Sequence, residues 1–195
     1  MVIADSFAWA HLPKTGGDAT QRMLAGVPGL VRFADDPASD DKHLPFFARE
    51  DRLGGRLLVM NIRRLPAWAL SGAQHRARHG LAPDYRPAPL EDAEAICRKT
   101  DADDLLRWMT DHGRLAVGRW LRTESLSEDV VALLEHVGVA GEVARAAVGR
   151  VGRVNAGDYE HDVTRHFTAA QIERLYALNP GWAAIEREVY GGVAG

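Results

Sequence analysis

FAWAHLPKTGGDATQRML, residues 7 to 24, joins a short apolar run to a glycine turn and then to a segment with helical spacing. The apolar run predicts a buried strand, and the residues after Gly17 predict a helix with one apolar face. Gly16 and Gly17 have no Cβ, so the backbone there can take positive φ and approach a ligand closely, while the first N–H groups of the helix lack partners. The stretch therefore predicts an anion site at the turn, with Lys14 as a mobile cation beside it.

A second apolar run, RLLVMNIR at residues 56 to 63, is the clearest signal for a central strand. The helix predicted after it carries Pro66 in its first turn. Because ligands bind at the carboxyl ends of strands in open α/β sheets, we expect the glycine turn and Arg63 to open onto one crevice. The pattern predicts a single α/β domain over residues 1–195, with a central parallel sheet flanked by helices.

Weaker signals predict the remaining elements. They are short apolar runs, helical stripes with acidic first turns, and clusters of proline and glycine. The expected elements are a strand at residues 30–33, helices at residues 91–100, 101–112, 168–176 and 182–190, a helix with Ser127 as its N-cap that ends before Gly138, and loops at residues 35–41, 80–90 and 149–159.

The composition limits the classes of function. Of the 195 residues 46% are hydrophobic, and a chain of this length buries about 70% of its unfolded surface without disulfides or metals. The formal net charge of −3 favours neither nucleic acid nor an anionic membrane as a partner. Cys97 is the only cysteine, so an intramolecular disulfide and a cysteine zinc site are excluded and the reducing cytoplasm is the expected location. The opening residues do not read as a signal peptide, and no apolar run approaches the ~20 residues of a membrane span.

The residues HLPKTGG at positions 11–17 resemble the 5′-phosphosulfate loop of sulfotransferases that use 3′-phosphoadenosine 5′-phosphosulfate (PAPS). The likeness is to the carbohydrate and membrane-associated branch, in which His-x-Pro-Lys-Thr-Gly-Gly-Thr is typical. The turn is not a Walker A loop, because Lys14 precedes the glycines. The resemblance implies a P-loop-like sulfotransferase fold, sulfuryl transfer from PAPS to a hydroxyl or amine, and release of adenosine 3′,5′-bisphosphate (PAP). The cofactor contacts that it implies here are Lys14, Thr15, Gly16, Gly17, Asp18 and Ala19.

A second signature of this family, Arg-Asp-Pro-x-x-Arg-x-x-Ser, aligns without gaps with RRLPAWALS at residues 63–71. Arg63 and Ser71 match, and the resemblance implies that they hold the 3′-phosphate. Arg64 replaces the family's Asp, and Trp68 replaces its second Arg. A guanidinium and a hydroxyl are good phosphate partners. The alternative for Arg63 is an ion pair that caps the strand.

Two later stretches extend the resemblance. RWLRTESL at residues 119–126 is similar to a family strand that reads roughly Tyr-Leu-Arg-Thr-Glu-x-Leu, and GRVGRVNAGDY at residues 149–159 loosely resembles a late loop that closes over the nucleotide. The resemblance implies nucleotide contacts from Arg150, Arg153 and Asn155. The alternative is a mobile surface loop, which is compatible with that role.

His43 is the first candidate for the general base, because in the resembling family a His-containing element lies between the phosphosulfate loop and the next core strand. The alternative is a histidine on a surface loop, and Glu124 is the second choice for the base. Asp18 stands where the family usually has Thr or Ser. We expect its carboxylate to face outward and cap its own helix, with a role as an alternative base or as a contact for an acceptor amine left open. Some related enzymes take the base from a Glu near the position of Met23, and that route is closed here.

Two other functions remain open from the sequence. One is a non-catalytic module that binds PAP or another nucleotide, and the other is a small-metabolite kinase. The expected acceptor of a sulfotransferase is a small molecule or a carbohydrate. His75 and His79 stand four residues apart, but no carboxylate pattern accompanies them, so no metal is expected.

Overall fold

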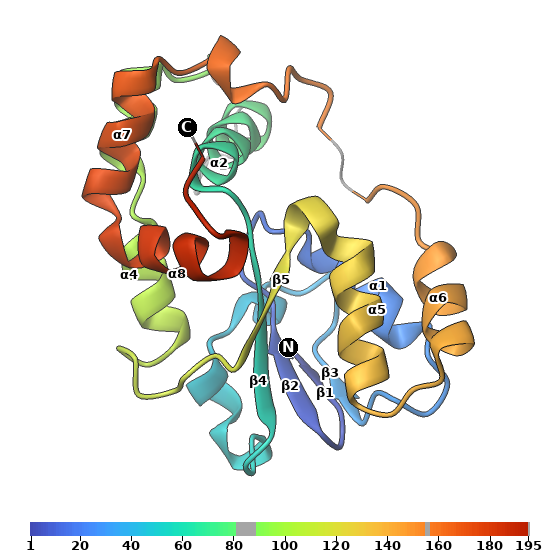
Figure 1. Ribbon diagram of the computed structural model, residues 1–195. Helices are drawn as coiled ribbons and strands as arrows, with labels where there is room; N and C mark the ends of the chain where they lie inside the picture. The colour runs from blue at the N-terminus through green and yellow to red at the C-terminus, as the bar shows by residue number, and fades with distance from the viewer. Residues whose placement is uncertain (81–88, 155–156, 195) are drawn as a thin grey trace. The chain divides into compact units, whose positions relative to one another are not determined.

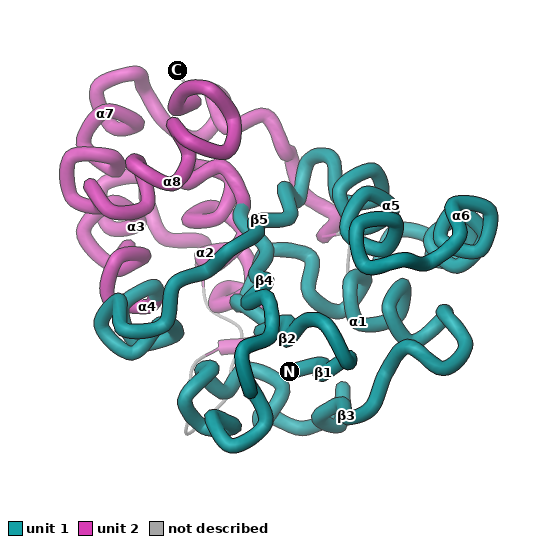
Figure 2. Tube along the Cα trace, turned by 60° about the horizontal axis from the view of Figure 1, so that its bottom comes forward, with its two compact units in different colours: residues 1–62, 106–155 teal, residues 63–105, 156–195 magenta. Residues whose placement is uncertain are grey.

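The computed structural model describes residues 1–80, 89–154 and 157–194. The chain divides into two compact units, shown in Figure 2, and each unit is built from two segments of the sequence. The first unit contains residues 1–62 and 106–155, and the second contains residues 63–105 and 156–195. The expectation of a single domain over residues 1–195 stays a prediction.

The first unit holds a five-stranded sheet with the order β3-β1-β2-β4-β5. The strands are β1 (Val2–Ile3), β2 (Phe7–Ala10), β3 (Phe33–Ala34), β4 (Leu57–Ile62) and β5 (Arg119–Arg122). β4 pairs in parallel with both β2 and β5, whereas β1 is antiparallel to β2 and β3. The predicted α/β class is confirmed, and the expectation of an entirely parallel sheet is wrong at β1. An antiparallel neighbour needs only a tight turn, and here Ala4 N–H closes that turn on Phe7 O at 2.9 Å.

One face of this sheet is covered by α1 (Gly17–Ala25), α5 (Leu126–His136) and α6 (Gly141–Gly149), which lie together in Figure 1. The three helices contact one another, and α5 also contacts β5. Their apolar faces close a core with the strands. Its buried members include Phe7, Trp9, Val59 and Leu121 of the sheet and Met23, Leu24, Val130, Leu133, Leu134, Ala144 and Ala147 of the helices. Short 3₁₀ helices complete the unit: η1 (Asp40–His43), η2 (Phe46–Arg52) and η3 (Thr123–Ser125).

The second unit is helical in its described parts and contains α2 (Leu65–His79), α3 (Ala93–Lys99), η4 (Val163–Arg165), α7 (Ala169–Leu178) and α8 (Pro180–Tyr190). α4 (Ala102–Met109) runs from this unit into the first one. Glu186 of α8 is fully buried and binds the start of α2, since its Oε1 accepts from Leu65 N–H at 2.5 Å. Its Oε2 accepts from Arg64 at 3.2 Å and from the Tyr176 hydroxyl at 3.1 Å.

Most elements that the sequence predicts are present with nearby boundaries. Two expectations fail, and one helix was not predicted. The strand at residues 30–33 is wrong except at Phe33, because Leu30 N–H turns back to Val27 O at 3.3 Å. Ser127 is not an N-cap, because α5 begins one residue earlier, directly after η3. α6 was not predicted at all.

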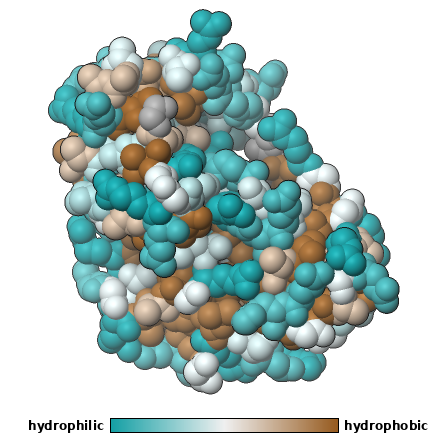
Figure 3. Space-filling model, viewed as in Figure 1, coloured by the Kyte–Doolittle hydropathy of each residue, from teal (hydrophilic) through white to brown (hydrophobic). Residues whose placement is uncertain are grey.

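Among the residues that the structure describes, no helix is long and apolar enough to cross a membrane. Figure 3 shows hydrophilic residues interspersed with apolar ones on one face. The large apolar side chains that are exposed among the described residues lie at separate positions in the sequence of both units: Phe47, Leu90, Trp108, Val143, Leu178 and Val193. Residues 81–88 of the predicted proline-rich loop lie outside the described residues.

Candidate functional site

The loop between β2 and α1 has an unusual backbone. Lys14 has φ 66°, and Gly16, the N-cap of α1, has φ 84° and ψ 16°. A non-glycine residue in this left-handed region costs on the order of 1 kcal/mol and persists only where the surroundings hold it. No side chain caps the first turn of α1. The loop therefore ends at an uncapped helix N-terminus, which is the arrangement expected for an anion site.

Asn61 of β4 holds this loop in place. Its side chain is fully buried, and Nδ2 donates to Thr15 O at 2.9 Å and to Thr20 Oγ1 at 2.8 Å. Oδ1 accepts from Trp9 Nε1 at 2.7 Å. One amide therefore joins β2, the loop and the first turn of α1 through three hydrogen bonds.

A threonine after β5 supports the same carbonyl. Thr123 Oγ1 lies 2.8 Å from Thr15 O and 3.0 Å from Ile62 O, so its single hydroxyl proton serves two carbonyls. The buried hydroxyl of Thr15 donates to Leu12 O at 2.7 Å. Because that hydroxyl is used within the loop, a ligand would meet the backbone of Thr15 rather than its side chain.

Asp18, in the first turn of α1, pairs with Lys42 of η1. The Lys42 Nζ to Asp18 Oδ1 distance is 3.0 Å, and both side chains are largely buried, at 18% and 26% exposure. Partial burial, the largest single influence, opposes ionisation of Asp18, but the hydrogen bond from Lys42 and the neighbouring positive charges together outweigh it and lower the pKa of that carboxyl. The carboxylate is therefore ionised and charge-compensated at neutral pH. No sequence motif identifies Lys42, which is 24 positions away from Asp18.

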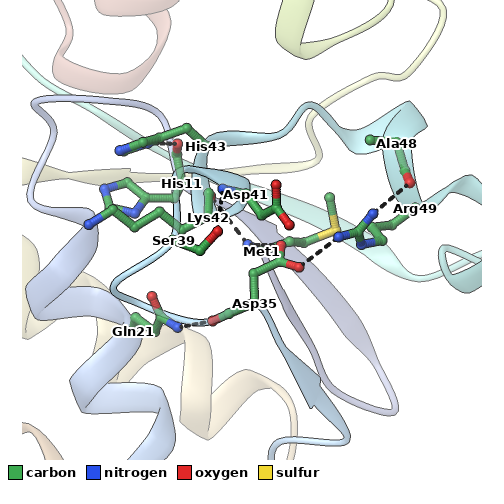
Figure 4. A network of polar contacts seen from close by, with 10 residues as sticks. All are labelled: Met1, His11, Gln21, Asp35, Ser39, Asp41, Lys42, His43, Ala48 and Arg49. Atoms are coloured by element: carbon green, nitrogen blue, oxygen red, sulfur yellow. Dashed lines mark hydrogen bonds and ion pairs between the residues drawn. The ribbon is translucent and has the colours of Figure 1, made fainter.

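His43 lies beside the start of the loop, as Figure 4 shows. Its Nδ1 is 3.2 Å from His11 O, and its ring centroid is 4.4 Å from that of His11. A carbonyl only accepts, so Nδ1 carries the proton and Nε2 carries the lone pair. Burial lowers the pKa of His43, which keeps the ring neutral at pH 7. A neutral imidazole with an available lone pair has the protonation state that a general base needs.

His11 itself packs against the first residue of α1. A Cβ on Gly17 would stand 1.9 Å from His11 Cδ2, so only glycine fits at this position. His11 is 4% exposed. Burial, followed by the charge of His43, lowers its pKa to about 3. His11 is not among the predicted site residues, because its only signal in the sequence is its place in the HLPKTGG segment.

A network around Asp35 anchors the segment that carries Lys42 and His43 (Figure 4). The Asp35 carboxylate, which is almost fully buried, accepts from the Met1 ammonium at 2.7 Å and from Arg49 at 3.0 Å. Its carbonyl accepts from Gln21 Nε2 of α1 at 2.9 Å. The network thereby ties this segment to β1 and to α1.

The predicted site residues fall into both units. The loop residues 14–19 and His43 lie in the first unit, where the structure brings His43 to the base of the loop. Arg153 is exposed and also belongs to the first unit. Arg63 and Ser71 belong to the second unit, where Arg63 O accepts from Trp182 Nε1 at 3.0 Å.

Four further residues from the sequence comparison with the family lie as follows. Arg150 stays a prediction as a nucleotide contact, and its guanidinium donates to Gly26 O at 3.1 Å, just beyond the C-terminal end of α1. Arg64 pairs with Glu186 and lies over the Tyr190 ring, which gives it a structural role. Glu124 is exposed in η3. Asn155 lies outside the described residues.

No protein-family model, curated protein or solved structure matches this chain. Among the described residues, no cluster of three or more His, Cys, Asp or Glu side chains could hold a metal ion.

Proposed function

We propose that the chain is a sulfotransferase that moves a sulfuryl group from PAPS to a hydroxyl or amine of a small molecule or carbohydrate. The observation that carries the proposal is the backbone of the loop, in which Lys14 is held at φ 66° two residues before Gly16, the N-cap of a helix without a side-chain cap. Backbone strain of this kind concentrates at ligand sites. The residues in this conformation are the ones that resemble the phosphosulfate loop.

The chemistry would need little covalent work from the protein, as in phosphoryl transfer. The backbone N–H groups of Thr15, Gly16 and Gly17 would bind the 5′-phosphosulfate, and Lys14 would compensate the charge that grows on the bridging oxygen. The acceptor oxygen or nitrogen would attack sulfur in line, the bond from sulfur to the bridging oxygen would break, and PAP would leave. His43 Nε2 would take the acceptor's proton.

A module that binds the nucleotide without turnover is the second candidate. Arg64 of the second signature is engaged with Glu186, so this signature retains only Arg63 and Ser71 as candidate phosphate contacts. A kinase is disfavoured, because the loop lacks the lysine of a Walker A motif. The predicted cytoplasmic location is kept with the proposal on the basis of the single cysteine.

Calorimetry of the whole chain with PAP, 5′-AMP and ATP tests the donor site. The proposal expects PAP to bind most tightly, with affinity lost in Lys14→Ala and Arg63→Ala. Lys99→Ala is the matched control, because the Lys99 side chain is exposed and pairs with Glu91 in the second unit. A preference for ATP would support a kinase, and an absence of PAP binding would overturn the proposal.

Turnover separates the two remaining candidates. Incubation with PAPS and a panel of hydroxyl and amine acceptors should release PAP, and the rate should fall by a large factor in Lys14→Ala while the fold stays intact. If PAP binds but the chain releases no PAP from PAPS with any of the carbohydrate or small-molecule acceptors, the binding module is favoured.

A further inference from the structure

Two side chains of α8 hold the backbone that follows β4. Trp182 Nε1 donates to Arg63 O at 3.0 Å, and Glu186 Oε1 accepts from Leu65 N–H at 2.5 Å. Both side chains are fully buried, and their spacing of four residues puts them on the same face of the helix. One face of α8 therefore holds the two peptide groups on either side of Arg64.

α8 is itself anchored at this end within the second unit. The Asp103 carboxylate accepts from Gly181 N–H at 2.8 Å and from Trp182 N–H at 2.7 Å, so it pairs two of the N–H groups that a helix start leaves without intrahelical partners. The Trp182 ring lies against Trp68 of α2, with the ring centroids 5.0 Å apart. The indole N–H therefore reaches Arg63 O from a side chain whose own backbone and ring are restrained.

The same face of α8 gives two consecutive arginines different tasks. Arg64 pairs with Glu186 Oε2 at 3.2 Å, and its guanidinium carbon is 4.1 Å from the centre of the Tyr190 ring. Arg64 is bound to α8 through its side chain, whereas Arg63 meets α8 through its carbonyl. The peptide plane that contains this carbonyl also contains the Cα of Arg63, so the hydrogen bond from Trp182 restrains the point at which the Arg63 side chain begins.

We propose that Trp182 and Glu186 are positioning residues for Arg63, and that through them α8 determines how strongly the chain prefers a nucleotide with a 3′-phosphate over one without it. The inference rests on the proposed function for the assignment of Arg63 to the 3′-phosphate. A guanidinium binds two phosphate oxygens in a fixed planar geometry, and displacing such a group by about 1 Å weakens its contacts strongly. Loss of the restraint on Arg63 should therefore affect the 3′-phosphate and not the rest of the nucleotide.

The test measures the ratio of the dissociation constants of 5′-AMP and PAP by calorimetry on the full chain. The two ligands differ only in the 3′-phosphate, so a general loss of nucleotide affinity leaves this ratio unchanged. The ratio should fall by about tenfold in Arg63→Ala, as expected for a lost hydrogen bond to a charged group. In Trp182→Phe, which keeps a ring against Trp68 but has no donor for Arg63 O, the ratio should fall by about threefold.

A double variant shows whether Trp182 acts through Arg63. In the Arg63→Ala background, Trp182→Phe should leave the ratio at the value that Arg63→Ala alone gives, since the group that Trp182 positions is absent. A further fall of the ratio in that background would overturn the inference, because Trp182 would then act on the ligand by another route. An unchanged ratio in Trp182→Phe alone would also overturn it.

Tyr176→Phe is the matched control, because it likewise removes one hydrogen-bond donor from an aromatic side chain of this network. The Tyr176 hydroxyl bonds to Glu186 Oε2 at 3.1 Å and to Ala194 N–H at 3.0 Å, so its loss should lower stability but leave the ratio at the wild-type value. Equal falls of the ratio in Tyr176→Phe and Trp182→Phe would contradict the inference. Urea unfolding checks the fold of every variant.

Two variants of Glu186 test its contact with α2. Glu186→Gln keeps an acceptor for Leu65 N–H and should retain most of the ratio, whereas Glu186→Leu has no acceptor and should lose about threefold. Both changes remove the charge that pairs with Arg64. Equal ratios in Glu186→Gln and Glu186→Leu would therefore contradict the positioning role of Glu186.

A measurement without ligand separates this inference from the proposed function. The backbone order parameters of Arg63 and Arg64 from ¹⁵N relaxation should be about 0.85 in wild type, as in rigid backbone, and lower in Trp182→Phe. If wild type binds PAP no better than 5′-AMP but these order parameters fall in Trp182→Phe, the donor site is wrong and the positioning of Arg63 by α8 stands. If wild type prefers PAP and Trp182→Phe changes neither the ratio nor the order parameters, the proposed function stands and this inference is wrong. If wild type has no preference and the order parameters stay the same, both are wrong.

Discussion

At the scale of single residues, the loop depends on two positions with opposite requirements. Gly17 must be glycine, because the His11 ring occupies the space of its missing side chain. Lys14 is not glycine although its φ of 66° favours glycine. A strained lysine is retained where its side chain serves a purpose that glycine could not, which supports its assignment to the donor site.

Gly17→Ala tests the fit of His11. The added Cβ would stand 1.9 Å from His11 Cδ2, so the buried ring must move, and the free energy of unfolding should fall by about 2 kcal/mol, a typical cost of overpacking. Urea unfolding measures the change. Gly149→Ala in α6 is the control, because its Cβ would meet nothing within 4 Å, so this change should be neutral or slightly stabilising. Equal effects at the two positions would contradict this account of Gly17.

Asp18 and Lys42 should act as a pair in anion binding. Lys42→Ala leaves an uncompensated carboxylate in the first turn of α1, so the affinity for sulfate and for PAP should fall by about tenfold. Asp18→Asn should raise the affinity several-fold, because the repulsion is removed. In the Asp18→Asn background, Lys42→Ala should have little further effect. An unchanged loss in that background would mean that Lys42 binds the anion itself.

At the scale of elements, the strand, the loop and the helix behave as one assembly because buried amide and hydroxyl groups join them. Asn61 joins β4 to Trp9 of β2, to Thr15 of the loop and to Thr20 of α1. Its position in the apolar run of residues 56–63 predicts a strand, but its partners are 41 to 52 positions away in the sequence. A local pattern carries no information about contacts of that separation.

Asn61→Leu tests this assembly. The change leaves the Trp9 indole N–H without its acceptor and removes one donor from Thr15 O, so the free energy of unfolding should fall by about 3 kcal/mol. Thr123→Val is the matched control, because it removes one shared donor from Thr15 O and Ile62 O, leaves the Trp9 indole paired, and should cost about 1 kcal/mol. Urea unfolding gives both values, and a smaller loss for Asn61→Leu than for Thr123→Val would contradict the role of Asn61.

At the scale of the whole molecule, the buried histidine links folding to pH. His11 has a pKa of about 3 in the folded chain, against an ordinary value of 6.5. Between these two pKa values the unfolded chain binds a proton at His11 that the folded chain does not bind. The contribution of His11 to the free energy of unfolding is therefore complete above pH 6.5 and is lost as the pH falls toward 3. Besides burial, the charged groups that shift the pKa of His11 are His43, Asp18, Lys42 and the Met1 ammonium.

Unfolding in urea between pH 7.5 and pH 4.5 measures this linkage. The expected slope from one proton is about 1.4 kcal/mol per pH unit below pH 6.5. His11→Phe should lose less stability than wild type over this interval, by roughly 3 kcal/mol. His43, whose pKa is also lowered by burial, adds a slope of the same sign in both proteins. Identical slopes for wild type and His11→Phe would show that His11 does not titrate on unfolding.

The sequence predicts the α/β class, a strand in the apolar run that begins at Phe7, a strand at residues 56–63, which the structure has as Leu57–Ile62, and the helix after Gly17, because each depends on neighbours within a few positions. It does not predict β1, whose two residues have too little length for a periodic pattern. It does not predict α6 either, since no element is predicted between Gly138 and Gly149, where this helix ends.

The strand, the glycine turn and the helix were determined by the sequence alone, since an apolar run and the freedom of glycine act locally. The tertiary structure decided which side chains serve the loop. Asn61 and Lys42 reach it only because the chain returns to the loop after tens of residues. The state of His11 likewise depends on the packing around it, because burial of its ring, and not its neighbours in the sequence, keeps it neutral beside α1.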